Sequence, residues 1–306
     1  MLILVSGEGP TDLGRCLGAD PCEGDAFQPG PMAWLVDQIA ETSERYSFLE
    51  LHLMVFLSKQ RLSETSKKLK PPSLPGRKRG QETAYYFRNA RALALEAIDL
   101  AATSGQSVIA VLFRDADGTQ SAGRGQWRDK WNSMCQGFDH EGYAAGVPMI
   151  PKPKSEAWLL CALKPSQPYQ HCARIEDESG NDAGLDALKS QLESALGKPP
   201  TATLLAELVR EGRVDAARIE MASFVRFRER LQHVLKDPLG TMERKGLSNG
   251  CIGVDSLTVS GHRCSGFFKP GLPEATYLND LRMSLFSYNL DRKFRLQKAL
   301  SYSLGY

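Results

Sequence analysis

Short apolar runs alternate with stretches of helical spacing over the first half of the chain. The apolar runs are rich in Val, Ile, Leu, Met and Phe, which is typical of buried strands; they cover residues 2–6, 49–57, 107–113 and 146–150. Helical spacing is found at residues 31–46, 82–102, 126–138 and 156–163. Strands that alternate with helices predict an α/β fold, with a mostly parallel sheet flanked by helices.

The pattern changes after residue 163. Three further segments have helical spacing, without an apolar run of strand type between them: 182–197, 201–211 and 215–235. Residues 238–272 are rich in glycine, and weak helical patterns return at 274–288 and 291–303. We therefore expect a catalytic domain over 1–165, a helical extension packed on it over 166–236, and a C-terminal appendage over 237–306 whose role the sequence does not reveal.

Residues 58–80 lack apolar periodicity and contain several prolines and basic residues. Prolines and like charges oppose regular packing, so we expect a loop or mobile arm here. Positive charges without acidic neighbours suit contact with a phosphate backbone. The candidate residues in this segment are Lys67, Lys68, Lys70, Arg77, Lys78 and Arg79.

Composition narrows the class of protein only slightly. The formal net charge of the 306 residues is +2, so any binding of nucleic acid must come from local patches of charge. The seven cysteines are odd in number and irregularly spaced, which favours reduced thiols and a cytoplasmic protein over a disulfide framework. We also expect neither a signal peptide nor a membrane span, since the apolar runs are too short to cross a bilayer.

Acidic side chains follow three of the four predicted strands at the point where each strand ends. The carboxyl ends of parallel strands meet at one edge of a sheet, where functional sites gather. If the three strands are neighbours, their carboxylates repel one another unless a proton or a cation neutralises them. A hard divalent ion such as Mg²⁺ or Mn²⁺ suits such oxygen ligands. The residues concerned are Glu8, Asp12, Asp115, Asp117 and Glu156, accompanied by Lys152 and Lys154.

These segments resemble the TOPRIM family, which has a glutamate in a Gly-rich turn after the first strand and an Asp-x-Asp after a later strand. Here the first element is SGEGPTD, residues 6–12, and the second is FRDADG, residues 113–118. The surrounding sequence is most similar to OLD-type nucleases and stand-alone TOPRIM proteins of bacterial defence loci. It shares their Lys/Pro-rich segment leading into Glu-x-Trp, residues 151–158, but has Asp12 where they have a second glutamate.

The resemblance implies a Rossmann-like TOPRIM sheet and a Mg²⁺- or Mn²⁺-dependent endonuclease acting on DNA or RNA, as an effector of anti-phage defence. It also implies a possible regulatory partner, such as an ATPase from the same defence system. Carried over residue by residue, the catalytic groups are Glu8, Asp115, Asp117 and Lys154. The metal ligands are Glu8, Asp12, Asp115, Asp117 and Glu156. Arg114 and Lys152 join the basic segment as contacts to nucleic acid.

Two other interpretations stay open at this point. The run VLFRDADGT, residues 111–119, also resembles the first motif of haloacid-dehalogenase-like phosphatases, with Asp115 as nucleophile. That motif normally lies near the start of its domain, and it leaves the SGEGPTD element unexplained. Alternatively, the acidic edge belongs to a non-catalytic regulatory subunit that binds a metal or a nucleotide.

Overall fold

A mixed sheet of five strands forms the centre of the part of the chain that the computed structural model describes: residues 1–69, 83–116, 126–181, 184 and 187–237. The strands are β1 (Leu2–Gly7), β3 (Cys22–Glu23), β5 (Met54–Leu57), β6 (Val108–Phe113) and β7 (Gly146–Met149), in the order β3-β5-β1-β6-β7. Four strands are parallel, and the short edge strand β3 pairs with β5 antiparallel. The expected α/β class with a mostly parallel sheet is confirmed, and the one antiparallel strand makes the sheet mixed.

Strand β1 lies in the middle of the sheet, with β5 on one side and β6 on the other. Val5 pairs with Phe56 and with Val111, and Gly7 pairs with Phe113 at the carboxyl end. Along the chain, β5 follows on one side of β1, and β6 and β7 then follow on its other side. The space beyond β1 and β6 is therefore the point where the strand order reverses, and ligands bind there in open α/β sheets.

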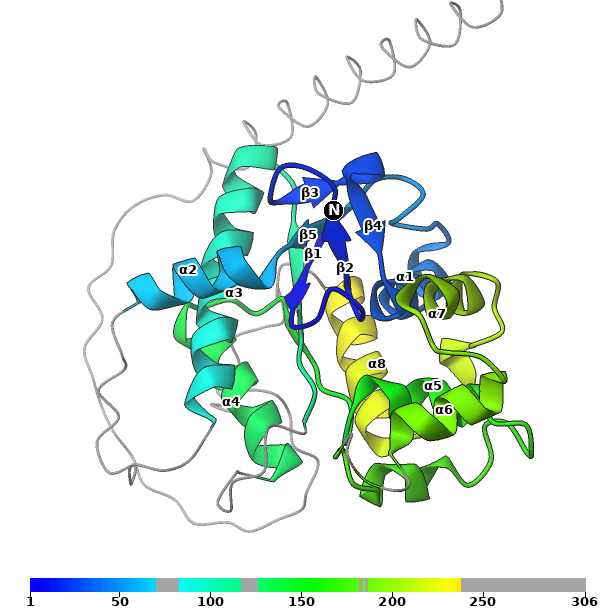
Figure 1. Ribbon diagram of the computed structural model, residues 1–306. Helices are drawn as coiled ribbons and strands as arrows, with labels where there is room; N and C mark the ends of the chain where they lie inside the picture. The colour runs from blue at the N-terminus through cyan, green and yellow to red at the C-terminus, as the bar shows by residue number, and fades with distance from the viewer. Residues whose placement is uncertain (70–82, 117–125, 182–183, 185–186, 238–306) are drawn as a thin grey trace, which may run out of the picture. The chain divides into compact units, whose positions relative to one another are not determined.

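Helices cover both faces of the sheet (Figure 1). On one side lie α2 (Lys59–Lys68), α3 (Ala84–Ser104) and α4 (Trp127–His140), with α3 packed on β6 and α4 on β7. On the other lie α1 (Pro31–Glu44), α7 (Ala202–Arg210) and α8 (Ala222–Lys236), with α8 packed on β7 and on α1. Helix α5 (Ser155–Leu163) packs on α6 (Leu188–Leu196). The remaining short elements are β2 (Gly14–Cys16), β4 (Phe27–Pro29), η1 (Gly24–Ala26), η2 (Cys172–Asp177) and η3 (Ala216–Arg218).

An aromatic cluster joins α5 to α8. The indole of Trp158 is fully buried, lies edge-on to Phe224 with ring centroids 4.8 Å apart, and stacks on Phe227 at 5.9 Å. Its ring nitrogen donates a hydrogen bond of 2.9 Å to the Ser223 hydroxyl, so the one polar atom of the side chain is satisfied. Residues 1–253 form one compact unit, and the second unit, residues 254–306, lies outside the described residues with the helices expected at 274–288 and 291–303.

Two boundaries differ from the sequence-based expectation. The strand expected over 49–57 is confined to Met54–Leu57, because the buried Asp37 carboxylate accepts hydrogen bonds from the amides of Phe48 and Leu49 and holds the preceding segment in a turn. The loop expected from residue 58 is wrong for its first part, where α2 forms. Ser58 caps this helix by accepting from the amide of Arg61, and Leu62 is its one buried residue. A single apolar side chain produces no periodicity, so the helix was not visible in the sequence.

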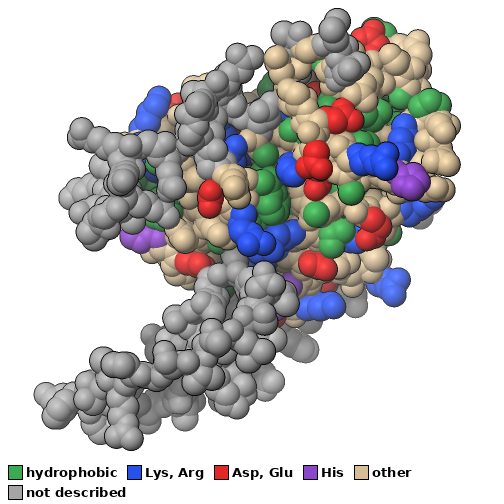
Figure 2. All heavy atoms as spheres, turned by 90° about the horizontal axis from the view of Figure 1, so that it is seen from below, with side chains coloured by type: hydrophobic (Ala, Val, Ile, Leu, Met, Phe, Trp, Pro, Cys, Tyr) green, Lys and Arg blue, Asp and Glu red, His purple; other side chains and the backbone are tan. Residues whose placement is uncertain are grey.

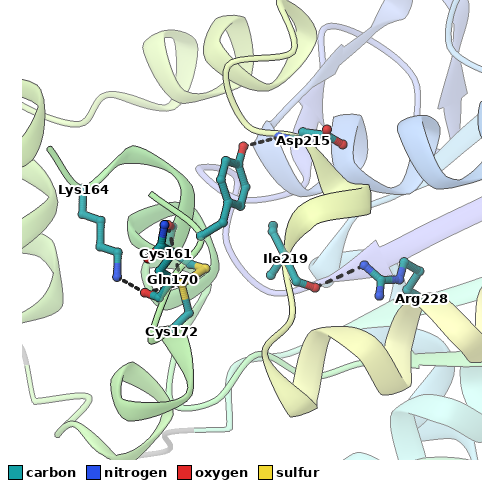
Figure 3. Close-up of a disulfide and its surroundings, with 8 residues drawn as sticks. Cys161, Lys164, Gln170, Cys172, Asp215, Ile219 and Arg228 are labelled. Carbon is teal, nitrogen blue, oxygen red and sulfur yellow. Dashed lines mark hydrogen bonds between the residues drawn. A yellow bond between two sulfur atoms is a disulfide. The ribbon is translucent and has the colours of Figure 1, made fainter. Parts of the chain in front are cut away.

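The expectation of reduced thiols is wrong for the five cysteines among the described residues, all of which are disulfide-bonded. Cys16 is bonded to Cys22, which joins β2 to β3, and Cys161 is bonded to Cys172, which joins the end of α5 to η2. Figure 3 shows the second bond beside the hydrogen bond from Lys164 to the Gln170 carbonyl. The fold brings each pair together across a short loop, which irregular spacing along the chain does not exclude. The argument from cysteines for a reducing cytoplasm therefore loses its premise.

The short antiparallel pair β2–β4 was not expected from the sequence. Among the described residues, no helix is both long and apolar enough to cross a bilayer.

Candidate functional site

Three neighbouring parallel strands deliver the predicted acidic residues to one edge of the sheet. Glu8 follows β1 directly, Asp115 follows β6 by two residues, and Glu156 lies in the first turn of α5, after β7. Strand β6 pairs with β1 on one side and with β7 on the other. Glu8 and Asp115 thus follow the two strands, β1 and β6, between which the strand order reverses.

Two glycines allow the chain to turn tightly at this edge. A Cβ on Gly7 would lie 2.2 Å from the carbonyl oxygen of Phe113, so only glycine lets β1 and β6 approach so closely here. Gly9 has φ +85°, a conformation that side chains rarely adopt, and its missing Cβ leaves room for the carboxylate of Asp12. The Gly-rich turn around Glu8 therefore has a definite geometric role beside the acidic site.

Ser155 is the common partner of three carboxylates. Its backbone amide donates a hydrogen bond of 2.9 Å to Asp115 Oδ1, and its hydroxyl donates one of 2.5 Å to Asp12 Oδ1. The same hydroxyl oxygen lies 3.4 Å from Glu156 Oε2. Residues from the segments after β1 and β6 and from α5 are thus held around one serine. Helix α5 begins at Ser155, and the side chain of this residue points to Asp12.

Charge repulsion and burial change the proton affinity of this group. Burial is the main cause that raises the pKa of Asp12 to about 6, and the charges of Glu156 and Glu8 raise it further against the hydrogen bonds from Ser155 and Thr11. The pKa of Asp115 is raised well above its usual value, first by burial and then by Asp12, Glu156 and Glu8. A carboxylate group of this kind holds protons readily, and a divalent cation among the side chains would displace them.

Glu8 is turned towards positive charges. Its Oε2 lies 3.3 Å from Arg114 Nη1 and 3.8 Å from Lys59 Nζ. It nevertheless raises the pKa of both Asp12 and Asp115, so its charge acts on the acidic group. Within the described ranges, no three or more His, Cys, Asp or Glu side chains are arranged so that they could hold a metal ion. Asp117, the second residue of the Asp-x-Asp pair, lies outside those ranges.

The predicted cationic residues lie in different places. Lys154 is the N-cap of α5, next to Ser155, and Arg114 adjoins Asp115. Lys152 Nζ lies 3.0 Å from Asp177 Oδ1 at the surface. Lys67 and Lys68 form the last turn of α2. Four further predicted contacts to nucleic acid lie outside the described residues: Lys70, Arg77, Lys78 and Arg79.

Sequence reasoning missed two groups that hold the edge in place. The hydroxyl of Tyr86 donates a hydrogen bond of 2.9 Å to the Asp115 carbonyl. The buried Lys130 reaches from α4 and donates to the Ala116 carbonyl from its ammonium group. Both side chains come from helices on the same face of the sheet and fix the turn after β6. A lysine and a tyrosine inside helical stretches produce no signal in the sequence that would have pointed to this role.

Charges of both signs occur on one face of the molecule (Figure 2). Figure 2 shows the face seen from below in Figure 1, with Lys and Arg side chains interspersed with Asp and Glu over the part that is coloured. A hollow of about 600 Å³, lined in part by Arg15, Trp34 and His52, lies instead near the amino end of β5 and away from the acidic group. The acidic group and this hollow are therefore at different places in the fold.

Comparison with known proteins adds no assignment. No family model, no curated protein and no solved structure matches this chain.

Proposed function

We propose that the chain is a divalent-metal-dependent nuclease of the TOPRIM type, which hydrolyses phosphodiester bonds with Mg²⁺ or Mn²⁺. The observation that carries the proposal is the convergence of Asp12, Asp115 and Glu156 on Ser155, beyond the ends of three adjacent parallel strands. Glu8, from the Gly-rich turn, acts on the same group through its charge. Carboxylate oxygens are the ligands that a hard dication prefers.

Asp12, Asp115 and Glu156 would hold such an ion only after their side chains turn towards it, because no three described carboxylates are now arranged to do so. Asp117 is the predicted fourth ligand. The bound metal would supply positive charge to the phosphoryl oxygens and would acidify a water molecule. In this proposal Glu8 would accept a proton from the attacking water once substrate phosphate competes for Arg114 and Lys59. Lys154, at the start of α5, is the candidate for stabilising charge on the oxygen that leaves phosphorus.

The phosphatase alternative receives no specific support. Burial and three neighbouring acids raise the pKa of Asp115, which opposes its use as an ionised nucleophile unless a cation is bound. Glu8 and Asp12 lie around it, and a phosphatase that uses Asp115 alone leaves their placement unexplained. A role in anti-phage defence and a regulatory partner protein remain parts of the proposal that rest on the resemblance.

The direct test is a cleavage assay on plasmid, single-stranded DNA and tRNA, each with Mg²⁺, with Mn²⁺ and with a chelator. We expect cleavage of at least one substrate that depends on the metal and disappears in Asp115→Asn. Asp25→Asn is the matched control, because Asp25 is exposed in η1 and lies by the hollow near the amino end of β5. Cleavage that survives in Asp115→Asn, or that needs no metal, would contradict the proposal.

A further inference from the structure

Tyr85 is an exposed aromatic side chain beside the acidic site. It lies in the first turn of α3, and 40% of its surface is accessible to solvent. The guanidinium carbon of Arg114 lies 3.7 Å from the centroid of its ring, so the cation covers one face. A single exposed aromatic side chain is ordinary at a protein surface, so its surroundings must indicate whether this one binds a ligand.

The ring is held in place from two sides. Arg114 is itself fixed by its ion pair with Glu8, and its guanidinium lies between Tyr85 and the site. Tyr86 lies edge-on to Tyr85, with ring centroids 6.4 Å apart and planes at 82°. Tyr86 is in turn anchored through its hydroxyl to the Asp115 carbonyl. A ring fixed before binding loses little conformational entropy when a planar ligand stacks on it.

Positive charge surrounds the ring. Lys59, whose side chain is 59% exposed, lines a small hollow together with Tyr85, Arg114 and Glu8. Arg88 is exposed three residues further along α3, on the same face of the helix as Tyr85. An aromatic surface with cations around it suits the alternation of base and phosphate in a single strand.

We propose that Tyr85, backed by Arg114, is a stacking platform for an unpaired nucleobase, and that the substrate is therefore single-stranded nucleic acid. This inference rests on the proposed nuclease function and adds the substrate class to it. A base within a duplex has both faces covered by its neighbours, so it can reach the ring only after it leaves the stack. A nucleotide stacked on Tyr85 places an adjacent phosphate beside Arg114 and Glu8, at the edge where the carboxylates converge.

The test measures binding separately from cleavage. Fluorescence anisotropy with labelled single strands of DNA and of RNA, and with the matching duplexes, is recorded in Ca²⁺, which occupies oxygen sites and normally does not support cleavage. The proteins are the wild type, Tyr85→Ala, Tyr85→Phe and Ile98→Ala. Ile98 is the control because it is 43% exposed on the same helix but lines no part of the small hollow beside Glu8.

We expect Tyr85→Ala to raise the Kd for a single strand by about five- to a hundredfold, the loss that follows from removing one base–aromatic stack. Tyr85→Phe keeps the ring and the affinity, and Ile98→Ala binds as the wild type does. Duplex binding is weaker and does not respond to Tyr85→Ala. The DNA and RNA arms show which sugar the site accepts. Equal affinity of wild type and Tyr85→Ala for single strands, or equal losses on single strand and duplex, would overturn the inference.

The failure of this inference can be told apart from failure of the nuclease proposal. If Asp115→Asn abolishes cleavage but Tyr85→Ala binds single strands normally, the nuclease stands and the platform does not. If the wild type cleaves nothing but binds single strands through Tyr85, the platform stands and the site serves binding alone.

Discussion

Removing one carboxylate from the acidic group should stabilise the metal-free protein, in a way that depends on pH. In Asp12→Asn the amide oxygen can still accept from the Ser155 hydroxyl, while the charge that Glu156 and Glu8 repel is lost. The pKa of Asp12 rises from 3.8 unfolded to about 6 folded. A shift of this size corresponds to about 3 kcal/mol of free energy of unfolding, which the wild type loses between about pH 4 and pH 6.

The sign follows from which state binds the proton more tightly. The folded state holds the proton on Asp12 to higher pH than the unfolded state does. The contribution of this proton to the free energy of unfolding is therefore fully present below the unfolded pKa, and it is lost as the pH rises through about 6. Asn has no such proton. Asp12→Asn should therefore leave the free energy of unfolding unchanged in acid and raise it by about 1–3 kcal/mol at neutral pH. The lower value allows for a weaker hydrogen bond to the neutral amide.

Urea unfolding in a chelator at about pH 4.5 and about pH 7.5 measures this difference. We expect Asp12→Asn to be more stable than the wild type at the higher of these two pH values but not at the lower one. The exposed Asp25→Asn should show no such dependence on pH. Added Mg²⁺ should stabilise the wild type more than Asp12→Asn at neutral pH, because the variant has lost a charged ligand. An Asp12→Asn variant that is less stable at neutral pH, or whose difference is the same at both pH values, would refute the account of charge crowding.

Three further substitutions test the site and its support. Glu8→Gln should abolish metal-dependent cleavage with unchanged thermal stability, and retained phosphatase activity on a small phosphomonoester would instead favour the haloacid-dehalogenase interpretation. Ser155→Ala should lower the affinity for Mn²⁺ about 10- to 100-fold in calorimetry, since it leaves Asp12 without its hydroxyl donor. Ser155→Thr should retain the affinity of the wild type. If Ser155→Ala binds Mn²⁺ as tightly as the wild type does, Ser155 does not support the metal site. Trp158→Ala should cost about 3–5 kcal/mol in urea unfolding through loss of the buried contacts with Phe224 and Phe227, whereas a cost near zero would contradict the packing described.

The fold was predictable where one type of signal dominates. Continuous apolar runs identified β1, β6 and β7, because strands buried on both faces need apolar residues throughout. The rule that functional groups gather beyond the carboxyl ends of parallel strands then pointed to Glu8, Asp115 and Glu156. The edge strand β3 has only two residues, and α2 buries only Leu62, so neither carried a pattern that a sequence can show.

The connections within the site were not predictable, because they join distant parts of the chain. The hydrogen bond from Ser155 to Asp12 spans 143 residues, and the contact between Arg114 and Tyr85 depends on how α3 packs beside β6. Tyr85 itself lies at the start of an ordinary helical pattern. No spacing rule relates such residues, so their roles appear only when the packing of helices on the sheet is known.

Arg114 connects the acidic group to the aromatic surface. In the metal-free protein its guanidinium and Lys59 form ion pairs with Glu8, while burial and the neighbouring acids raise the pKa of Asp12 and Asp115. At neutral pH, above its pKa of about 6, Asp12 is ionised and its charge is repelled by Glu156 and Glu8. A phosphate that draws Arg114 and Lys59 away would free Glu8, and a dication would then take over the charge balance. Substrate and metal would in that case bind better together than apart, because each relieves the charge that the other leaves uncompensated.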